Sequence, residues 1–279
     1  DHQATGELLR ATLMEILGYI GAVIMGLSLG LIGGGGSILT VPILVYLFHI
    51  DAVQATAYSL FIVGLTSLVG GWSHRRMGNI HWRAAVMFGL PSIAAVYATR
   101  AWLVPAIPDP IMRLGDGVIS KPVGILILFA VVMLVAALSM IRKPVRADGA
   151  APPPTLPRLP LVMAEGALVG VVTGIVGAGG GFLIIPALVL LARLPMKQAV
   201  GTSLMIIAAK SLIGFLGDLQ GDTIIDWTFL LTFSMVAIVG IVLGSRLSRR
   251  VANEKLRPAF GYFVLVMGLC IIGRELIVL

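Results

Sequence analysis

Residues 30–42 read GLIGGGGSILTVP, and residues 174–186 read GIVGAGGGFLIIP. From residue 30 to residue 60, 13 of 31 positions are identical to those 144 residues later, without a gap. Shared apolar composition would give scattered matches, but here the glycines and prolines recur together with Gln54 as Gln198 and Ser59 as Ser203. The chain therefore contains an internal repeat.

The composition places both copies in a lipid bilayer. Of the 279 residues, 58% are hydrophobic and only 12% are charged, whereas a soluble domain carries about 25% charged residues. A full crossing needs roughly 20 apolar residues, so two of the apolar runs, Ile38–Phe48 and Phe182–Ala192, are too short to span. The runs are 13–32, 38–48, 55–71, 82–104, 122–141, 160–176, 182–192, 199–216, 227–245 and 258–277.

These runs predict an all-α polytopic membrane protein with two repeats of five hydrophobic helical segments each. A Gly-rich break separates segments 1 and 2 of each repeat. The first repeat covers residues 1–141 and the second covers residues 159–279. The polar, proline-rich residues 142–158 form the predicted cytoplasmic linker.

Basic loops give the predicted orientation. Segments 72–83, 142–158, 193–198 and 245–257 hold 14 of the 20 Lys and Arg residues, and the positive-inside rule places them in the cytoplasm. Equivalent loops, 72–83 and 217–226, then face opposite sides, so each copy makes an odd number of crossings. We therefore expect inverted repeats, a transporter architecture, in a bacterial inner membrane with both termini outside.

The glycine breaks are the first candidate binding elements. The short run after each break cannot cross the bilayer, so each break is expected at membrane depth, where irregular backbone is tolerated in a protein-lined cavity. Free N–H groups at a helix N-terminus suit an anion. The alternative is close packing of helices through small residues. The candidate residues are Gly34, Gly35, Gly36 and Ser37 in one copy and Gly179, Gly180 and Gly181 in the other; Ala178, which interrupts the second run, contributes none.

The proline in each short run, Pro42 or Pro186, either kinks its helix or begins it. If it begins the helix, residues such as Ser37–Val41 are left extended. Both placements remain open from the sequence.

The helix after each break begins with polar side chains. Gln54 and Tyr58, and in the other copy Gln198 and Thr202, lie four residues apart and share a helical face. With the neighbouring Ser59 and Ser203, these amides and hydroxyls could hold an oxyanion weakly enough for release. Helix capping and interhelical hydrogen bonds are an equal alternative.

Lys210 lies inside the apolar run 199–216, where a lysine is costly unless it faces a cavity or a partner. Thr66 occupies the equivalent position of the first copy, so the repeat does not account for the lysine. Its alternative role is a side chain that reaches the interface. Glu165, in run 160–176, is a weaker candidate for pairing or proton coupling, its alternative being an acid near the inner end.

Patterns of catalysis and cofactor binding are absent from the sequence. The four histidines lie near the ends of runs without HExxH or GxSxG spacing, and the glycine runs lack the Lys-Ser/Thr of a phosphate-binding loop. The single cysteine, Cys270, excludes an internal disulfide. We expect no enzyme activity, no cofactor and no metal. The net charge of +7 arises in short loops, so no nucleic-acid partner is expected either.

The glycine, proline and glutamine positions of both copies resemble those of the sulfite exporter TauE/SafE family of membrane permeases. The resemblance extends from about residue 15 to residue 277. The second copy fits best, with GAGGGFLIIP at 177–186 and AVGTSL at 199–204. It implies a secondary transporter that exports a small sulfur-containing anion, sulfite or an organosulfonate, by alternating access. The alternatives are a passive anion channel and uptake of the same substrates, and a coupling proton or ion is a further expected partner.

Overall fold

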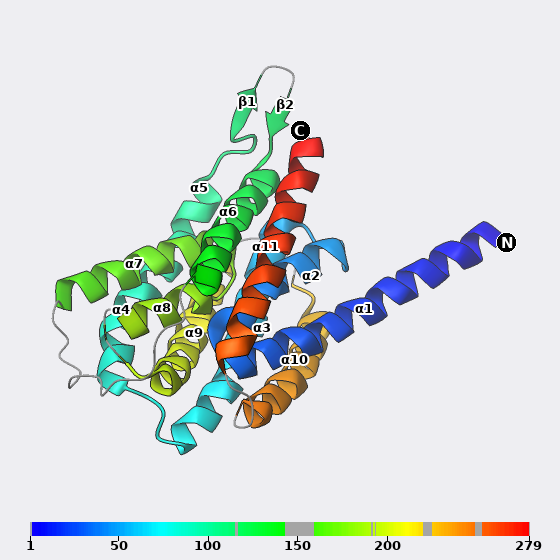
Figure 1. Ribbon diagram of the computed structural model, residues 1–279. Helices are drawn as coiled ribbons and strands as arrows, with labels where there is room; N and C mark the ends of the chain where they lie inside the picture. The colour runs from blue at the N-terminus through cyan, green and yellow to red at the C-terminus, as the bar shows by residue number, and fades with distance from the viewer. Residues whose placement is uncertain are drawn as a thin grey trace.

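The computed structural model describes residues 2–114, 117–142, 159–190, 192, 194–219, 225–248 and 253–278. It is a bundle of helices, from which the N-terminal part of α1 projects (Figure 1). The helices of the first half are α1 (His2–Ile32), η1 (Gly34–Leu39), α2 (Thr40–Tyr46), α3 (Ala52–Arg76), α4 (Trp82–Ala98), η2 (Thr99–Leu103), α5 (Val104–Ala106) and α6 (Lys121–Arg142). Those of the second half are α7 (Leu159–Val176), α8 (Gly181–Leu190), α9 (Met196–Asp218), α10 (Trp227–Leu247) and α11 (Asn253–Val278).

Six helices of the described residues are long and apolar enough to cross a membrane. They lie in α1, α3, α4 with η2 and α5, α6, α9 and α10. Large apolar side chains such as Leu90 and Met235 are more than 60% exposed, as expected for residues that face lipid. The prediction of a helical, multi-pass membrane protein is therefore confirmed.

Short helices follow both glycine breaks, at the predicted places. In the first half Gly33, with φ 76°, ends α1, and a 3₁₀-helix over Gly34–Leu39 leads into α2. The extended conformation considered for Ser37–Val41 is therefore wrong. Pro42 lies in the first turn of α2, where its missing N–H needs no intrahelical partner. Pro186 lies inside α8, which already begins at Gly181.

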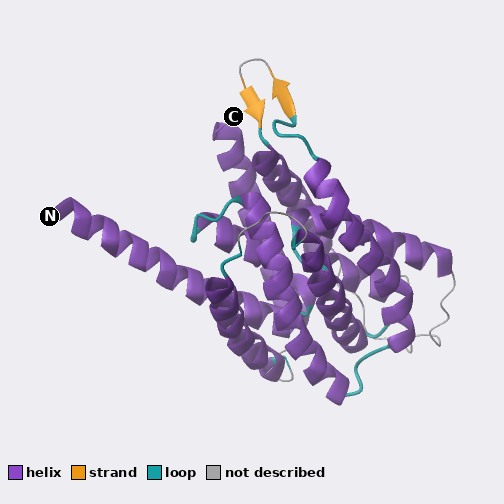
Figure 2. Cartoon of the chain, turned by 180° about the vertical axis from the view of Figure 1, so that it is seen from behind, coloured by secondary structure: helices purple, strands orange, loops and turns teal. Residues whose placement is uncertain are grey.

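A short antiparallel hairpin was not predicted. Strand β1 (Met112–Leu114) pairs with β2 (Gly117–Ile119), with Met112 opposite Ile119. In the sequence, a Gly-Asp-Gly turn signal lies at residues 115–117. Figure 2 shows the hairpin at the same end of the bundle as the C-terminus. Among the described residues, this hairpin is the one departure from the all-α prediction.

The packing of the long helices joins the two halves. Helix α1 packs along α10, α4 packs along α7, and α3 packs along α9, while α6 lies beside α11 (Figure 1). Glycine makes these contacts close: a Cβ on Gly26 would meet the backbone of Ala237, and one on Gly170 would meet the backbone of Ser92. Most of the predicted linker, residues 143–158, lies outside the described residues.

Candidate anion-binding site

The two glycine breaks touch each other in the interior. A Cβ placed on Gly34 would fall on the backbone of Gly181, and the reverse is also true. A Cβ on Gly179 would lie 3.3 Å from the Cβ of Ser37, whose Oγ donates to the Gly34 carbonyl at 2.7 Å. All four residues are buried. The structure therefore brings together predicted site residues from both halves, at a distance that only glycine permits.

The second break supplies a helix N-terminus with free donors. Gly177, Gly179 and Gly180 have φ values of 72°, 63° and 70°, a conformation that favours glycine. Gly180 N–H donates to Ala178 O at 2.7 Å. Among the backbone hydrogen bonds of the described residues, none is donated by Gly181 N–H at the start of α8. This end of α8 carries partial positive charge.

Lys210 lies beside this helix start. Its side chain is 0% exposed, and its Nζ donates to Thr173 Oγ1 of α7 at 2.7 Å. A Cβ on Gly180 would lie 2.7 Å from the same Nζ. In the described part of the chain, no carboxylate lies within ion-pair distance of Lys210. The ammonium and the start of α8 together form a buried positive region, which suits a small anion.

Tyr58 and Thr202 lie elsewhere and have structural partners. Tyr58 OH accepts hydrogen bonds from Asp226 N–H at 2.8 Å and from Gln54 Nε2 at 3.1 Å. Thr202 Oγ1 accepts from His81 N–H at 2.9 Å. Asp226 and His81 are the residues that cap α10 and α4. These hydroxyls therefore accept hydrogen bonds from the starts of helices of the opposite half. Interhelical hydrogen bonding was the alternative to anion binding that the sequence left open.

Within the described residues, no hydrogen bond joins the remaining predicted polar side chains to Lys210. Ser203 Oγ donates to Val200 O of its own helix at 2.8 Å. Ser59 is fully buried, and its Oγ has no partner in the described part of the chain. Gln198 is partly exposed at the start of α9. Glu165 is also partly exposed, and its Oε2 lacks a hydrogen-bond partner among the described residues.

The other two predicted glycines of the first break lie, like Gly34, in the 3₁₀-helix. Gly36 packs against α1, since a Cβ there would meet Met25 O and Leu29 N. Gly35 is buried in the same element. Neither the packing of Gly36 nor the burial of Gly35 identifies a ligand.

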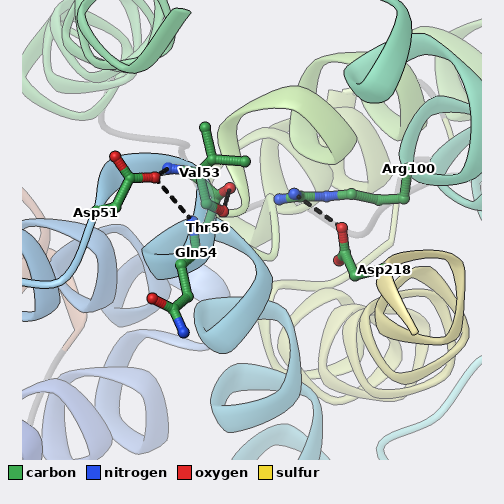
Figure 3. A network of polar contacts seen from close by, with 6 residues as sticks. All are labelled: Asp51, Val53, Gln54, Thr56, Arg100 and Asp218. Carbon is green, nitrogen blue, oxygen red and sulfur yellow. Dashed lines mark hydrogen bonds and ion pairs between the residues drawn. The ribbon is translucent and has the colours of Figure 1, made fainter. Parts of the chain in front are cut away.

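An ion pair that the sequence analysis missed lies at the far end of α9. Arg100 Nη1 and Asp218 Oδ1 are 3.4 Å apart, and the arginine side chain is 0% exposed (Figure 3). The same view shows Asp51, whose carboxylate accepts from Val53 N–H and caps α3. The signal that could have found the pair is an arginine inside the apolar run 82–104.

A cavity of about 480 Å³ opens between α3 and α10 and contains none of the predicted site residues. Its lining includes Gly70, Arg76, Ser245 and Arg246. It therefore lies apart from the glycine breaks.

Comparison with known proteins gives the family. The model of the sulfite exporter TauE/SafE family matches residues 18–271. A probable membrane transporter protein of Xylella fastidiosa is 31% identical over 272 residues, covering 95% of this chain and 97% of that protein. One from Methanocaldococcus jannaschii is 26% identical over 275 residues, covering 94% and 95%. No solved structure matches.

The family match spans both glycine breaks, the helix that carries Lys210 and most of the helices that pack around them. The relatives are named as transporters, and their alignments run over almost the whole of both chains. The protein is accordingly a membrane transporter and belongs to the sulfite exporter TauE/SafE family.

Proposed function

We propose that this protein is a secondary transporter that exports a small sulfur-containing anion, sulfite or an organosulfonate. Transport proceeds by alternating access of two inverted repeats around a site near the middle of the bilayer. The observation that carries the proposal is the buried Lys210, which has no carboxylate partner in the described residues and lies at the start of α8.

The charge at Lys210 is the reason to propose an anion. A buried ammonium is destabilised unless a negative group compensates it. Thr173 Oγ1 is a neutral partner, and it already donates its own proton to Val169 O at 2.7 Å. A bound oxyanion would supply the missing charge and could also accept from the free N–H groups of α8.

Exchanged hydrogen bonds support the inverted repeats. His81 N–H donates to Thr202 in the second half, and Asp226 N–H donates to Tyr58 in the first. The two hydroxyls are 144 positions apart and the two donors are 145 apart, after a one-residue slip of the repeat. Each donor residue also caps its own helix, by accepting from the N–H three residues later. Such reciprocal bonds are expected of a two-fold relation between the halves.

Glycine contacts are exchanged in the same way. A Cβ on Gly33 would meet Val200, and a Cβ on Gly177 would meet Thr56. Thr56 and Val200 are 144 positions apart, as are the two glycines. Both glycines also have positive φ values. These matched contacts favour residues 1–141 and 159–279 as two copies of one unit around a common axis.

The distribution of charge supports the orientation. Fourteen of the 20 basic residues lie in loops on one proposed side, which we assign to the cytoplasm of a bacterial inner membrane. Both termini, the hairpin and the Asp218 end of α9 then lie outside. Glu165, partly exposed in α7, is the proposed site for a coupling proton.

Binding and exchange measurements test the function. Purified protein should bind one or more of sulfite, thiosulfate, sulfoacetate and taurine more tightly than sulfate. Proteoliposomes loaded with the unlabelled substrate should then accumulate the labelled form by counterflow. Because a pore does not exchange substrates, saturable uptake without counterflow would identify a passive channel, and binding of none of these compounds would refute the substrate class.

A further inference from the structure

Two cationic residues are enclosed in the described part of the chain, Lys210 at 0% and Arg100 at 1% exposure. Both border the same face of helix α9. On α9, Lys210, Gly214 and Gly217 recur at intervals of four and three residues and so share a face. A Cβ on Gly217 would lie 2.9 Å from the Cβ of Arg100, and one on Gly214 would lie 3.0 Å from Val96. Helix α4 and the turn η2 therefore cover α9 at Gly214 and Gly217, and Gly217 lies about 10 Å along α9 from Lys210.

Arg100 has unused hydrogen-bonding capacity. Its one ion pair, to Asp218 Oδ1, measures 3.4 Å, whereas charge-assisted bonds are typically about 2.7–2.9 Å. Its Nε and Nη2 have no partner in the described residues, nor has Asp218 Oδ2. Buried charged groups are normally satisfied. The guanidinium therefore keeps two donor nitrogens that a tetrahedral or pyramidal oxyanion could engage.

The local backbone is also unusual at this point. Arg100 lies in the π-helical turn Thr99–Leu103, which interrupts the helix between α4 and α5. Single π-turns inside α-helices are rare and occur frequently at functional sites. This irregularity is a second observation, independent of the ion pair.

The repeat does not account for either cation. With the one-residue slip, Ser245 is the counterpart of Arg100, and Thr66 is the counterpart of Lys210. In the repeat α3 and α10 correspond to α9 and α4, and Ser245 lines the cavity between α3 and α10. The two counterpart positions are thus uncharged in the other copy, so the repeat itself does not require a cation at either position.

We propose that Arg100 forms a second anion-binding subsite between Lys210 and the outer end of α9, where the transported oxyanion displaces Asp218. This subsite rests on the proposed transport function and deepens it. The Asp218 side chain is 13% exposed and can be rehydrated when displaced, whereas Arg100 is enclosed and needs a replacement anion. Because α4 and η2 cover the Gly214–Gly217 face, the anion would reach Arg100 from Lys210 only when alternating access separates them from α9.

Sulfite binding to Asp218→Asn tests the subsite, with ³⁵S-sulfite as the probe in equilibrium dialysis of the full chain. Removal of the carboxylate frees Arg100, so Asp218→Asn should bind a second sulfite that wild type lacks. The double variant Arg100→Gln/Asp218→Asn, which leaves no unpaired charge, should lose this extra binding. Its sulfite counterflow should fall by about tenfold, a 1.4 kcal/mol effect. Arg83→Gln, at an exposed arginine, is the matched control and should behave as wild type.

Two results would overturn the subsite: wild-type counterflow in the double variant, or equal sulfite stoichiometry in Asp218→Asn and the double variant. If Asp218→Asn does not fold, counterflow of the double variant against wild type decides alone. Failure of the transport proposal has a different signature, namely no sulfite binding or counterflow in wild type. Extra binding to Asp218→Asn that requires Arg100 would still establish the subsite as an anion site.

Discussion

Lys210 shows how far a single residue can be interpreted from sequence. A lysine in the middle of an apolar run indicates a buried charge, and its replacement by Thr66 in the other copy shows that the repeat does not need it. The side chain is indeed 0% exposed, so the alternative of an interfacial lysine is wrong. Sequence could not supply its surroundings, because Thr173 and Gly180 approach it from elements that are distant along the chain.

Replacement of Lys210 tests its role directly. Lys210→Met removes the charge while it keeps an unbranched side chain in the enclosed space. The anion affinity of the purified protein should fall at least about tenfold, or 1.4 kcal/mol, while Lys210→Arg should retain part of it. Equilibrium binding of ³⁵S-sulfite, with size-exclusion profiles as the check on folding, measures both variants. Unchanged affinity in folded Lys210→Met would leave the backbone N–H groups of α8 as the anion ligands.

At the scale of elements, glycine and proline determine what was predictable. Both breaks and both short helices appear where the sequence predicts them, because glycine readily adopts positive φ and a short apolar run cannot span the bilayer. The roles of Tyr58 and Thr202 were not predictable, since their donors Asp226 and His81 come from the opposite half. Periodicity along one helix cannot identify such a partner.

The contact between the breaks gives a prediction for stability. Gly34→Ala or Gly181→Ala places a Cβ on the backbone of the facing break, so the helices must separate locally. Overpacking of this kind costs about 1–3 kcal/mol, and the melting temperature in detergent should fall for both variants. Gly273→Ala is the matched control, because a Cβ there meets nothing within 4 Å. Wild-type melting temperatures in both break variants would show that the two breaks do not touch.

At the scale of the whole molecule, each long helix of one half packs against a long helix of the other half. Helix α1 packs on α10 and α7 packs on α4, so the first helix of each half lies against the third long helix of the other. The long helices thus pack mainly against helices of the other half. Two buried cations break this regularity, because neither has a charged counterpart in the other copy: Lys210 of α9 contacts Thr173 of α7, and Arg100 of η2 pairs with Asp218 of α9.

Orientation in the membrane is the property on which the direction of transport depends, and it can be measured with two cysteines. The only native cysteine, Cys270, is exposed and is first replaced by serine. Gly149→Cys and Asp222→Cys then mark the loops proposed to face opposite sides; both positions lie outside the described residues, so the expectation rests on charge alone. Because basic residues are retained in the cytoplasm, a membrane-impermeant maleimide on intact cells should label Asp222→Cys but not Gly149→Cys. A permeant maleimide should label both.

Equal labelling by the impermeant reagent would contradict the inverted repeats, since loops on one side require an even number of crossings between them. Reversed labelling would keep the repeats but turn the molecule over, and Arg100 would then lie on the cytoplasmic side of Lys210.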